Sequence, residues 1–166
     1  RAVEKIHLLK TAKYTFEGPL HLGLVLGGAT PRILTLISEY AIPVGIAFQI
    51  QDDILGLFGT EEELGKSTTS DIQEGKQTLM TAFVFQNGTL AEQERLAQLL
   101  GKSDVSTEEL FETRQIITTS GALRHAETRA RNYAQTGKKA LTKALSPGRE
   151  RTILEELADF VIHRNA

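Results

Sequence analysis

The sequence predicts an all-α protein built as a single helical bundle. Strand signals are almost absent, because apolar and polar residues do not alternate over any extended stretch. Apolar residues instead recur at helical spacing along most of the 166 residues. No segment repeats at a fixed period and no shift in composition marks a boundary, so we expect residues 1–166 to form one domain.

The chain opens in the middle of a helical pattern. Apolar residues such as Val3 and Ile6 recur at helical spacing over residues 1–13, and no capping residue precedes them. The first residue is also not an initiator Met, so we expect an upstream part of the protein to be missing. We expect Gly18–Pro19 to break the chain, and a short apolar helix to follow as far as about Leu26.

A long apolar helix is predicted from Arg32 to Phe58. Thr30 is the expected N-cap and Pro31 the first helical position, where the missing amide hydrogen of proline leaves no bond unmade. Pro43 should bend this helix, because it removes one backbone hydrogen bond. Uninterrupted apolar runs are too short to cross a bilayer, so we expect no membrane span.

The second half of the chain is predicted as a loop followed by shorter helices. Gly59–Gly75 is polar and punctuated by glycines, with one helical turn expected at Glu61–Leu64. Ser106 and Glu109 have the spacing of a capping box at the start of a helix. The remaining helices are expected at Lys76–Gln86, Leu90–Leu100, Ser106–Thr118, Ala122–Leu145 and Glu150–Arg164.

Composition excludes some classes of function. The 19 basic and 21 acidic residues give a formal net charge of -2, so electrostatics give no reason to expect a nucleic-acid partner. The absence of cysteine excludes disulfides and thiolate metal sites and fits a reducing cytoplasm. The first residues do not have the pattern of a signal peptide, so we expect a cytoplasmic protein.

A polar stripe on the long helix is the strongest candidate for a functional site. Four of its residues share one helical face, because they are spaced i, i+3, i+4 and i+7: Gln49, Asp52, Asp53 and Gly56. Two adjacent carboxylates among apolar neighbours repel each other and lose hydration. Mg²⁺ relieves both costs, and it commonly binds one or two carboxylates together with substrate phosphates. The alternative is that the pair lies at the solvent-exposed end of a buried helix.

Basic residues near glycines or on the opening helix complete the candidate site. Lys66 follows Gly65, Lys76 follows Gly75, and each lysine taken alone fits a solvated surface. The opening helix carries three further candidates, Lys10, Thr11 and Tyr14. Together with the Asp pair these groups suit a magnesium diphosphate, because carboxylates bind the metal and lysines neutralise the remaining phosphate charge.

Three segments carry a family resemblance. Phe48–Gly59 (FQIQDDILGLFG) closely resembles the second aspartate-rich motif of trans-type polyprenyl diphosphate synthases, the family of the geranylgeranyl and farnesyl enzymes. Gly65–Lys76 is similar to the Gly-Lys…Asp-Ile-x-Glu-Gly-Lys segment of that family, and Lys10–Thr15 to its Lys-Thr motif. The segments occur in family order. The resemblance implies an isoprenoid-synthase-type helical bundle, of which this chain is the C-terminal half.

The resemblance also implies an activity and a role for each candidate residue. The activity is the magnesium-dependent condensation of isopentenyl diphosphate with an allylic diphosphate, with Asp52 and Asp53 binding Mg²⁺. The residues expected to bind the allylic diphosphate are Lys10, Gln49, Lys66 and Lys76. Those expected to act in catalysis are Lys10, Thr11 and Tyr14, the last two facing the developing carbocation.

The sequence departs from the family pattern at two points. Gly56 stands where the fuller motif has a third aspartate, which removes one anion near the metal. The family's first aspartate-rich motif, Asp-Asp-x-x-Asp, does not occur in the sequence. We therefore expect half of an active site, little turnover by these residues alone, and self-association or a homodimer through exposed apolar faces. For Asp71, a helix N-cap and a loop-bracing role both remain open.

Two other functions remain open. The first alternative is a non-catalytic regulatory or partner subunit of a hetero-oligomeric prenyl synthase. Such a subunit has no need for Lys10, Asp52, Asp53 and Lys66, which argues against it. A helical bundle without a ligand is the third reading. It predicts that Asp52→Ala and Asp53→Ala are neutral or stabilising, because each removes a like-charge repulsion.

Overall fold

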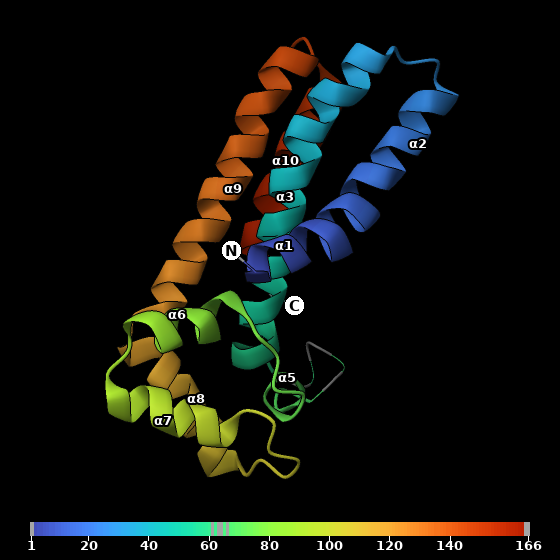
Figure 1. Cartoon of the computed structure of the whole chain (residues 1–166). Helices are drawn as coiled ribbons and strands as arrows, with labels where there is room; N and C mark the ends of the chain where they lie inside the picture. Colours follow the sequence, from blue (N-terminus) through green and yellow to red (C-terminus); the bar gives the residue numbers. More distant parts are fainter. Residues whose placement is uncertain (1, 61, 63–64, 66, 165–166) are drawn as a thin grey trace. The chain divides into compact units, whose positions relative to one another are not determined.

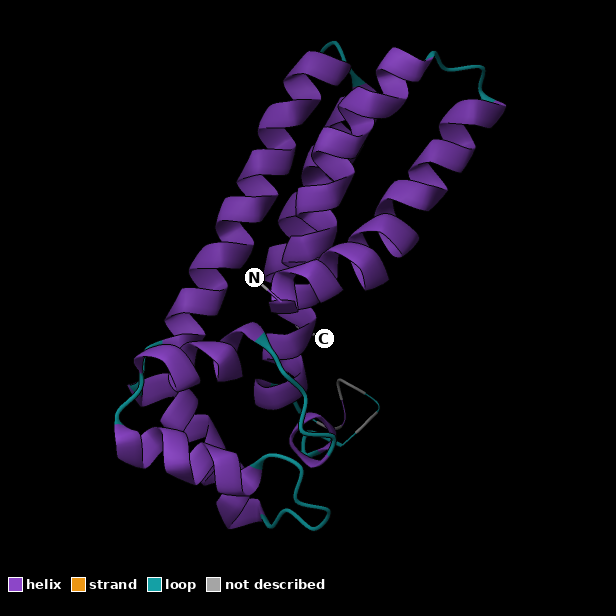
Figure 2. Ribbon diagram, in the orientation of Figure 1, coloured by secondary structure: helices purple, strands orange, loops and turns teal. Residues whose placement is uncertain are grey.

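The computed structural model describes residues 2–60, 62, 65 and 67–164. Every regular element in these ranges is a helix (Figure 2), so the predicted all-α fold is confirmed. The elements are α1 (Ala2–His7), the π-helix η1 (Leu8–Glu17), α2 (Gly18–Leu26), α3 (Pro31–Phe58), α5 (Ser70–Gln73), α6 (Leu79–Asn87), α7 (Leu90–Leu99), α8 (Thr107–Thr119), α9 (Ala122–Ala144) and α10 (Arg149–His163). Figure 1 labels the α-helices. They fall into two compact units, unit 1 (Arg1–Gln51 with Arg129–Arg164) and unit 2 (within Asp52–Thr128).

The chain does not break at Gly18–Pro19, and that prediction is wrong. α1, η1 and α2 follow one another without interruption, and Gly18 has helical backbone angles (φ −57°, ψ −55°). The Gly18 N–H donates to the Lys13 carbonyl, the i to i+5 bond of a π-helix. Pro19 lies in the first turn of α2, where the missing amide hydrogen leaves no bond unmade.

α3 is the longest helix of the described chain, and its composition is strongly apolar. It continues through Pro43 as one helix of 28 residues. Its most apolar 18-residue window has a mean hydropathy of 1.6, which by length and composition alone is enough to cross a membrane. The uninterrupted apolar runs of the sequence are shorter than this window, so they did not indicate it. Half of the window is buried inside the protein, as it is in the core helix of a globular fold.

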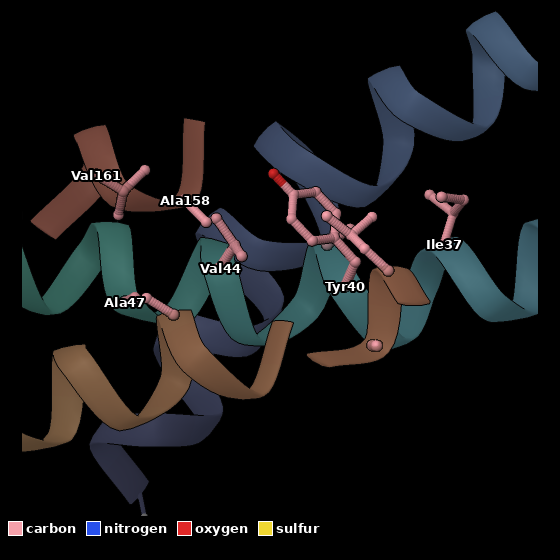
Figure 3. Close-up of a cluster of buried hydrophobic side chains, with 10 residues drawn as sticks. Ile37, Tyr40, Val44, Ala47, Ala158 and Val161 are labelled. Atoms are coloured by element: carbon pink, nitrogen blue, oxygen red, sulfur yellow. The ribbon is translucent and has the colours of Figure 1, made fainter. Parts of the chain in front are cut away.

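The core of unit 1 forms where α3 packs against α9 and α10. Figure 3 shows one face of α3 with Ile37, Tyr40, Val44 and Ala47, and α10 with Ala158 and Val161. Tyr40 is fully buried, and its hydroxyl donates to the Leu154 carbonyl of α10 at 2.7 Å. Burial raises the pKa of the Tyr40 hydroxyl. α9 approaches α3 closely at Gly137, where a Cβ would lie 2.6 Å from Val44 Cγ2.

Each of the three longer helices of unit 2 begins at a capping box. The box predicted for Ser106 and Glu109 is confirmed at the start of α8, and Thr89 with Glu92 forms another at the start of α7. α6 begins at Leu79 rather than at the predicted Lys76. Thr78 caps it, because the Thr78 hydroxyl accepts from the Thr81 N–H at 3.2 Å.

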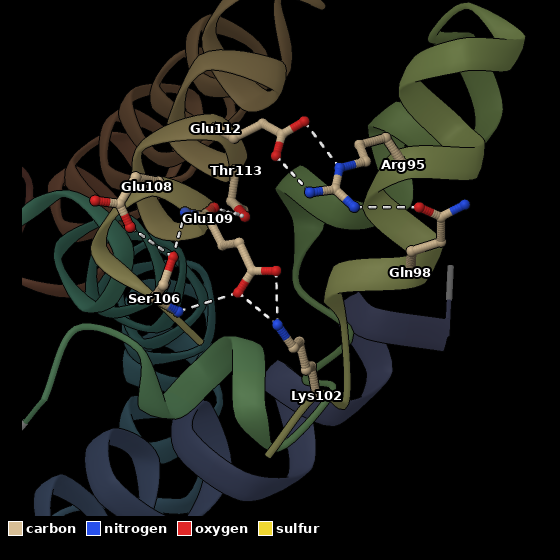
Figure 4. Close-up of polar contacts among 8 residues, drawn as sticks. All are labelled: Arg95, Gln98, Lys102, Ser106, Glu108, Glu109, Glu112 and Thr113. Carbon is tan, nitrogen blue, oxygen red and sulfur yellow. Dashed lines mark hydrogen bonds and ion pairs between the residues drawn. The ribbon is translucent and has the colours of Figure 1, made fainter. Parts of the chain in front are cut away.

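Ion pairs on the surface of unit 2 join its elements. Arg95 of α7 donates to both carboxylate oxygens of Glu112 of α8, at 2.8 and 2.7 Å (Figure 4). Lys102 reaches both oxygens of Glu109, each at 2.7 Å. The short helix α5 lies inside the segment predicted as a loop, whereas the helical turn expected at Glu61–Leu64 falls largely outside the described residues.

Candidate functional site

The carboxylate pair lies on a buried stretch of α3. Asp53 is 3% exposed, and Asp52, one residue earlier, is half-buried. The neighbours Ile50 and Ile54 are 1% and 7% exposed, so the helix holds the pair among apolar side chains. The alternative that both carboxylates lie in solvent at a helix end is therefore wrong for Asp53. An ionised carboxylate this deeply buried requires a compensating positive charge.

Lys76 supplies that positive charge. Gly75 has φ +61°, a left-handed turn that glycine adopts without strain, and Lys76 follows it directly. The Lys76 ammonium lies 3.1 Å from Asp53 Oδ1 and 2.9 Å from Asp71 Oδ2. Burial disfavours its charge, but the two carboxylates outweigh this and hold the pKa of Lys76 above its ordinary value. The ammonium therefore stays charged at neutral pH.

Asp71 braces the turn and does not cap a helix. It lies inside α5, whose N-cap position is Thr69, and its carboxylate accepts from Lys76 Nζ. The Lys76 backbone N–H also donates to the Asp71 carbonyl at 3.0 Å. The loop-bracing role left open by the sequence thus describes what Asp71 does. The signal in the sequence that could have indicated this contact is the position of Asp71 five residues before Lys76, with the glycine turn at Gly75 between them.

The Lys-Thr segment and Gln49 come together within unit 1. Thr11 is 5% exposed on η1, and its hydroxyl donates to Gln49 Oε1 at 2.5 Å. Close packing of η1 on α3 allows this contact, because a Cβ at Gly45 would lie 2.5 Å from the Ala12 Cα. The π-helix itself is a rare form of backbone that occurs frequently at functional sites.

The other predicted site residues are less constrained. Lys10 is exposed on η1, and Tyr14 is 82% exposed. The expectation that Tyr14 faces a carbocation stays a prediction. Lys66 lies outside the described residues.

Sequence reasoning missed the group that holds the end of α3. Arg114 of α8 donates through Nε to the Leu57 carbonyl at 2.7 Å and through a terminal nitrogen to the Gly59 carbonyl at 3.3 Å. Carbonyls at a helix end lack partners within the helix, and a guanidinium satisfies them well. Arg114 lies 57 residues from Leu57 in the chain, so no local pattern indicates the contact.

The carboxylates of Asp52 and Asp53 fit magnesium in one binding mode. The described part of the chain contains no cluster of three or more His, Cys, Asp or Glu side chains able to hold a metal. Asp52 and Asp53 nevertheless offer hard carboxylate oxygens on adjacent residues. Mg²⁺ often binds through one or two carboxylates and completes its octahedral shell with water and substrate phosphates. The site fits this mode and does not fit an all-protein cage.

A large groove lies elsewhere in unit 1 and contains none of the predicted site residues. It has a volume of about 710 Å³ and runs between α3 and α9. At its rim Lys143 Nζ lies 3.6 Å from Glu39 Oε2. The residues lining the groove include no carboxylate pair, so the polar stripe of α3 remains the candidate site for a magnesium diphosphate.

A comparison with known families decides the relationship. The family model described as Polyprenyl synthetase matches residues 2–117. The chain belongs to the polyprenyl synthetase family. The resemblance of its three motifs to this family is thereby confirmed.

Curated members of the family are similar over most of this chain. Geranylgeranyl diphosphate synthase of Methanosarcina mazei is 32% identical over 155 residues, which cover 93% of this chain and 46% of that protein. Short chain isoprenyl diphosphate synthase of Methanothermobacter thermautotrophicus is 36% identical over 142 residues, 86% of this chain and 43% of that protein. The chain thus spans about half the length of these relatives.

Solved structures of the polyprenyl synthetase family agree with the helical arrangement. Geranylgeranyl pyrophosphate synthase from Corynebacterium glutamicum, determined with isoprenyl diphosphate and magnesium, matches with a TM-score of 0.92 and 31% identity. The match covers 98% of this chain and 46% of that one. A polyprenyl synthase from Caulobacter crescentus, with calcium and isoprenyl diphosphate, gives 0.88 and 32% over 99% and 49% of the two chains.

Proposed function

We propose that this chain is part of a short-chain polyprenyl diphosphate synthase, which condenses isopentenyl diphosphate with an allylic diphosphate. One observation carries the proposal. This chain belongs to the polyprenyl synthetase family and has two adjacent carboxylates, Asp52 and Asp53, on a buried stretch of α3. The Lys76 ammonium lies 3.1 Å from Asp53, the more buried of the two. Relatives named as geranylgeranyl and short chain isoprenyl diphosphate synthases support this choice of substrates.

Asp52 and Asp53 would hold the magnesium ion. Their two carboxylates leave most of the coordination positions of Mg²⁺ to phosphate oxygens and water. When bound, the ion supplies Lewis-acid stabilisation of the diphosphate as it leaves. Lys76 already neutralises Asp53 in the protein and adds positive charge beside the same site.

The chain's own residues would bind and orient the allylic diphosphate. The Thr11 hydroxyl donates to the side-chain oxygen of Gln49. The amide nitrogen of the Gln49 side chain would therefore be its donor to a phosphate oxygen. Lys10 and Lys66 would add positive charge as the C–O bond breaks and both bonding electrons pass to the diphosphate. The double bond of isopentenyl diphosphate then attacks the allylic cation, and a proton is lost. Tyr14 and Thr11 would face that cation.

The remainder of the active site would come from residues outside this sequence. The chain spans about half the length of its relatives and has no Asp-Asp-x-x-Asp motif, so we expect little turnover from it alone. Exposed apolar side chains on η1 and α2, among them Leu9, Leu22 and Leu26, favour packing against further protein. The same features suit a partner subunit of a hetero-oligomeric synthase, which is our alternative.

Binding separates these proposals from a ligand-free bundle. Isothermal titration calorimetry would measure the affinity for geranyl diphosphate with MgCl₂ and, in parallel, with EDTA. We expect magnesium-dependent binding that Asp52→Ala weakens at least about tenfold, since it removes a metal ligand. Asp104→Ala is the matched control, because Asp104 is an exposed carboxylate of unit 2. Equal heats with and without magnesium in the unaltered chain would contradict the proposal and favour the ligand-free bundle.

A further inference from the structure

The α7–α8 hairpin, formed by the two helices and the turn between them, holds both of the segments that supply the Asp53–Lys76 ion pair. Asp53 lies on α3, whereas Lys76 follows the glycine turn after α5. The segments meet at the pair itself, where Lys76 Nζ lies 3.1 Å from Asp53 Oδ1. Each segment also forms hydrogen bonds to the hairpin at a separate point, so the hairpin links them a second time.

The turn of the hairpin holds the segment that carries Lys76. The Gly101 N–H of this turn donates to the Ile72 carbonyl of α5 at 2.8 Å. The turn is itself tied to α8, because the Lys102 ammonium reaches both carboxylate oxygens of Glu109 (Figure 4). The position of the segment before Lys76 is therefore fixed relative to α8.

Arg114 of α8 holds the other segment, the last turn of α3. Its guanidinium donates to the Leu57 carbonyl at 2.7 Å and to the Gly59 carbonyl at 3.3 Å. Leu57 lies four residues after Asp53, which is the spacing of one α-helical hydrogen bond, so Arg114 holds the turn that begins at this carboxylate. The last carbonyls of a helix have no partners within it, and helix ends fray. Loss of the guanidinium would therefore loosen the turn next to Asp53.

We propose that Arg114 is a positioning residue that fixes the end of α3 so that Asp53 stays in contact with Lys76. It acts through the α3 backbone, and a guanidinium suits this role because its planar fork donates to two carbonyls at once. Its effect on diphosphate binding rests on the proposed function, because that function uses Asp53 to hold the metal. Its effect on the ion pair is a property of unit 2 and does not require a ligand.

The first experiment follows the ion pair by NMR without a ligand. A lysine ammonium held by a carboxylate exchanges its protons slowly and gives an Nζ signal, and the signal of Lys76 is the one absent from Lys76→Met. We expect Arg114→Met to remove this signal and to speed amide exchange at Leu57 at least about tenfold, because the end of α3 opens locally. Arg114→Lys still reaches one carbonyl and should show a smaller change in the same direction.

The second experiment measures binding of magnesium pyrophosphate by calorimetry. Arg114→Met should weaken the affinity about tenfold, the lower end of the range for residues that orient metal ligands from outside the coordination shell. Arg114→Lys should bind within about threefold of the unaltered chain. Arg95→Met is the matched control, because the Arg95 guanidinium donates to the Glu112 carboxylate rather than to α3. It should leave the affinity within about twofold and the Lys76 signal unchanged.

The two experiments separate the failure of this inference from the failure of the proposed function. If Arg114→Met speeds amide exchange at Leu57 but leaves the Lys76 signal unchanged, Arg114 only stabilises a helix end and the inference is wrong. If Arg114→Met and Arg95→Met have equal effects, it is wrong whatever the chain binds. If the unaltered chain does not bind magnesium pyrophosphate but the Lys76 signal depends on Arg114, the proposed function fails and the positioning role stands.

Discussion

Replacing Lys76 with Met tests how strongly the buried carboxylates depend on one ammonium. The change keeps most of the length of the side chain and removes the cation that Asp53 and Asp71 share, at 3% and 9% exposure. Breaking a buried ion pair typically costs about 3–5 kcal/mol, because one charge is left uncompensated. The Lys76 side chain is 28% exposed, so water reaches part of it, and we take the lower end, about 3 kcal/mol.

Differential scanning calorimetry would measure the effect. A loss of about 1 kcal/mol lowers the unfolding midpoint of a chain of this size by about 2–4 °C, so Lys76→Met should lower it by about 6–12 °C. Adding MgCl₂ should recover more stability in this variant than in the unaltered chain, because a ligand that binds the folded state stabilises it. The combined change with Asp53→Asn should cost less than Lys76→Met alone, since the buried negative charge of Asp53 is then removed as well.

Lys102 provides the matched control. Its ammonium contacts Glu109 (Figure 4) at 2.7 Å, closer than Lys76 lies to Asp53. The Lys102 side chain is nevertheless 44% exposed. Exposed pairs contribute about 1 kcal/mol or less, so Lys102→Met should lower the midpoint by at most about 4 °C. Equal effects of the two lysine changes would show that burial does not decide the strength of these pairs, and our reasoning about the site would be wrong.

Two further predictions concern unit 1. Gly45→Ala should destabilise the chain by about 1–3 kcal/mol, because the added Cβ lies 2.5 Å from the Ala12 Cα, whereas Gly23→Ala should be neutral or stabilising; chemical denaturation measures both. Burial of Glu4 disfavours its charge, but its bonds from Arg129 and Tyr133 prevail and lower the pKa of Glu4 below 4.5. The stability gained from this lowered pKa is present above pH 4.5 and is lost as the pH falls through the folded-state value. Glu4→Gln should therefore cost up to about 1 kcal/mol at pH 7 and progressively less below pH 4.5; a cost independent of pH would contradict the assignment.

The sequence predicted the features that depend on local spacing. The capping box at Ser106 and the shared face of Gln49, Asp52 and Asp53 both follow from helical periodicity, and the structure has both elements. The all-α class and the family membership were also predictable, the second because three motifs occur together in order. These signals come from residues close together in the sequence, so they do not depend on how distant parts of the chain pack.

The features that the sequence did not predict depend on contacts across the chain. Gly18–Pro19 normally ends a helix, but here the π-helix before it continues directly into α2. The close packing at Gly45 and the hydrogen bonds from Arg114 to the end of α3 arise only once helices are placed against each other. A glycine in an apolar helix does not reveal, from the sequence alone, which group approaches it.

Unit 1 is assembled from two separated stretches of the chain. Tyr40 donates to the Leu154 carbonyl across 114 residues, so this bond cannot form on the ribosome until Leu154 has been synthesised. Translation proceeds at about 5–20 residues per second, so α3 waits several seconds for α9 and α10 with its apolar face uncovered. All of Asp52–Thr128 is made during that interval. A nascent chain arrested before α10 should consequently be a strong substrate for chaperones that bind apolar segments.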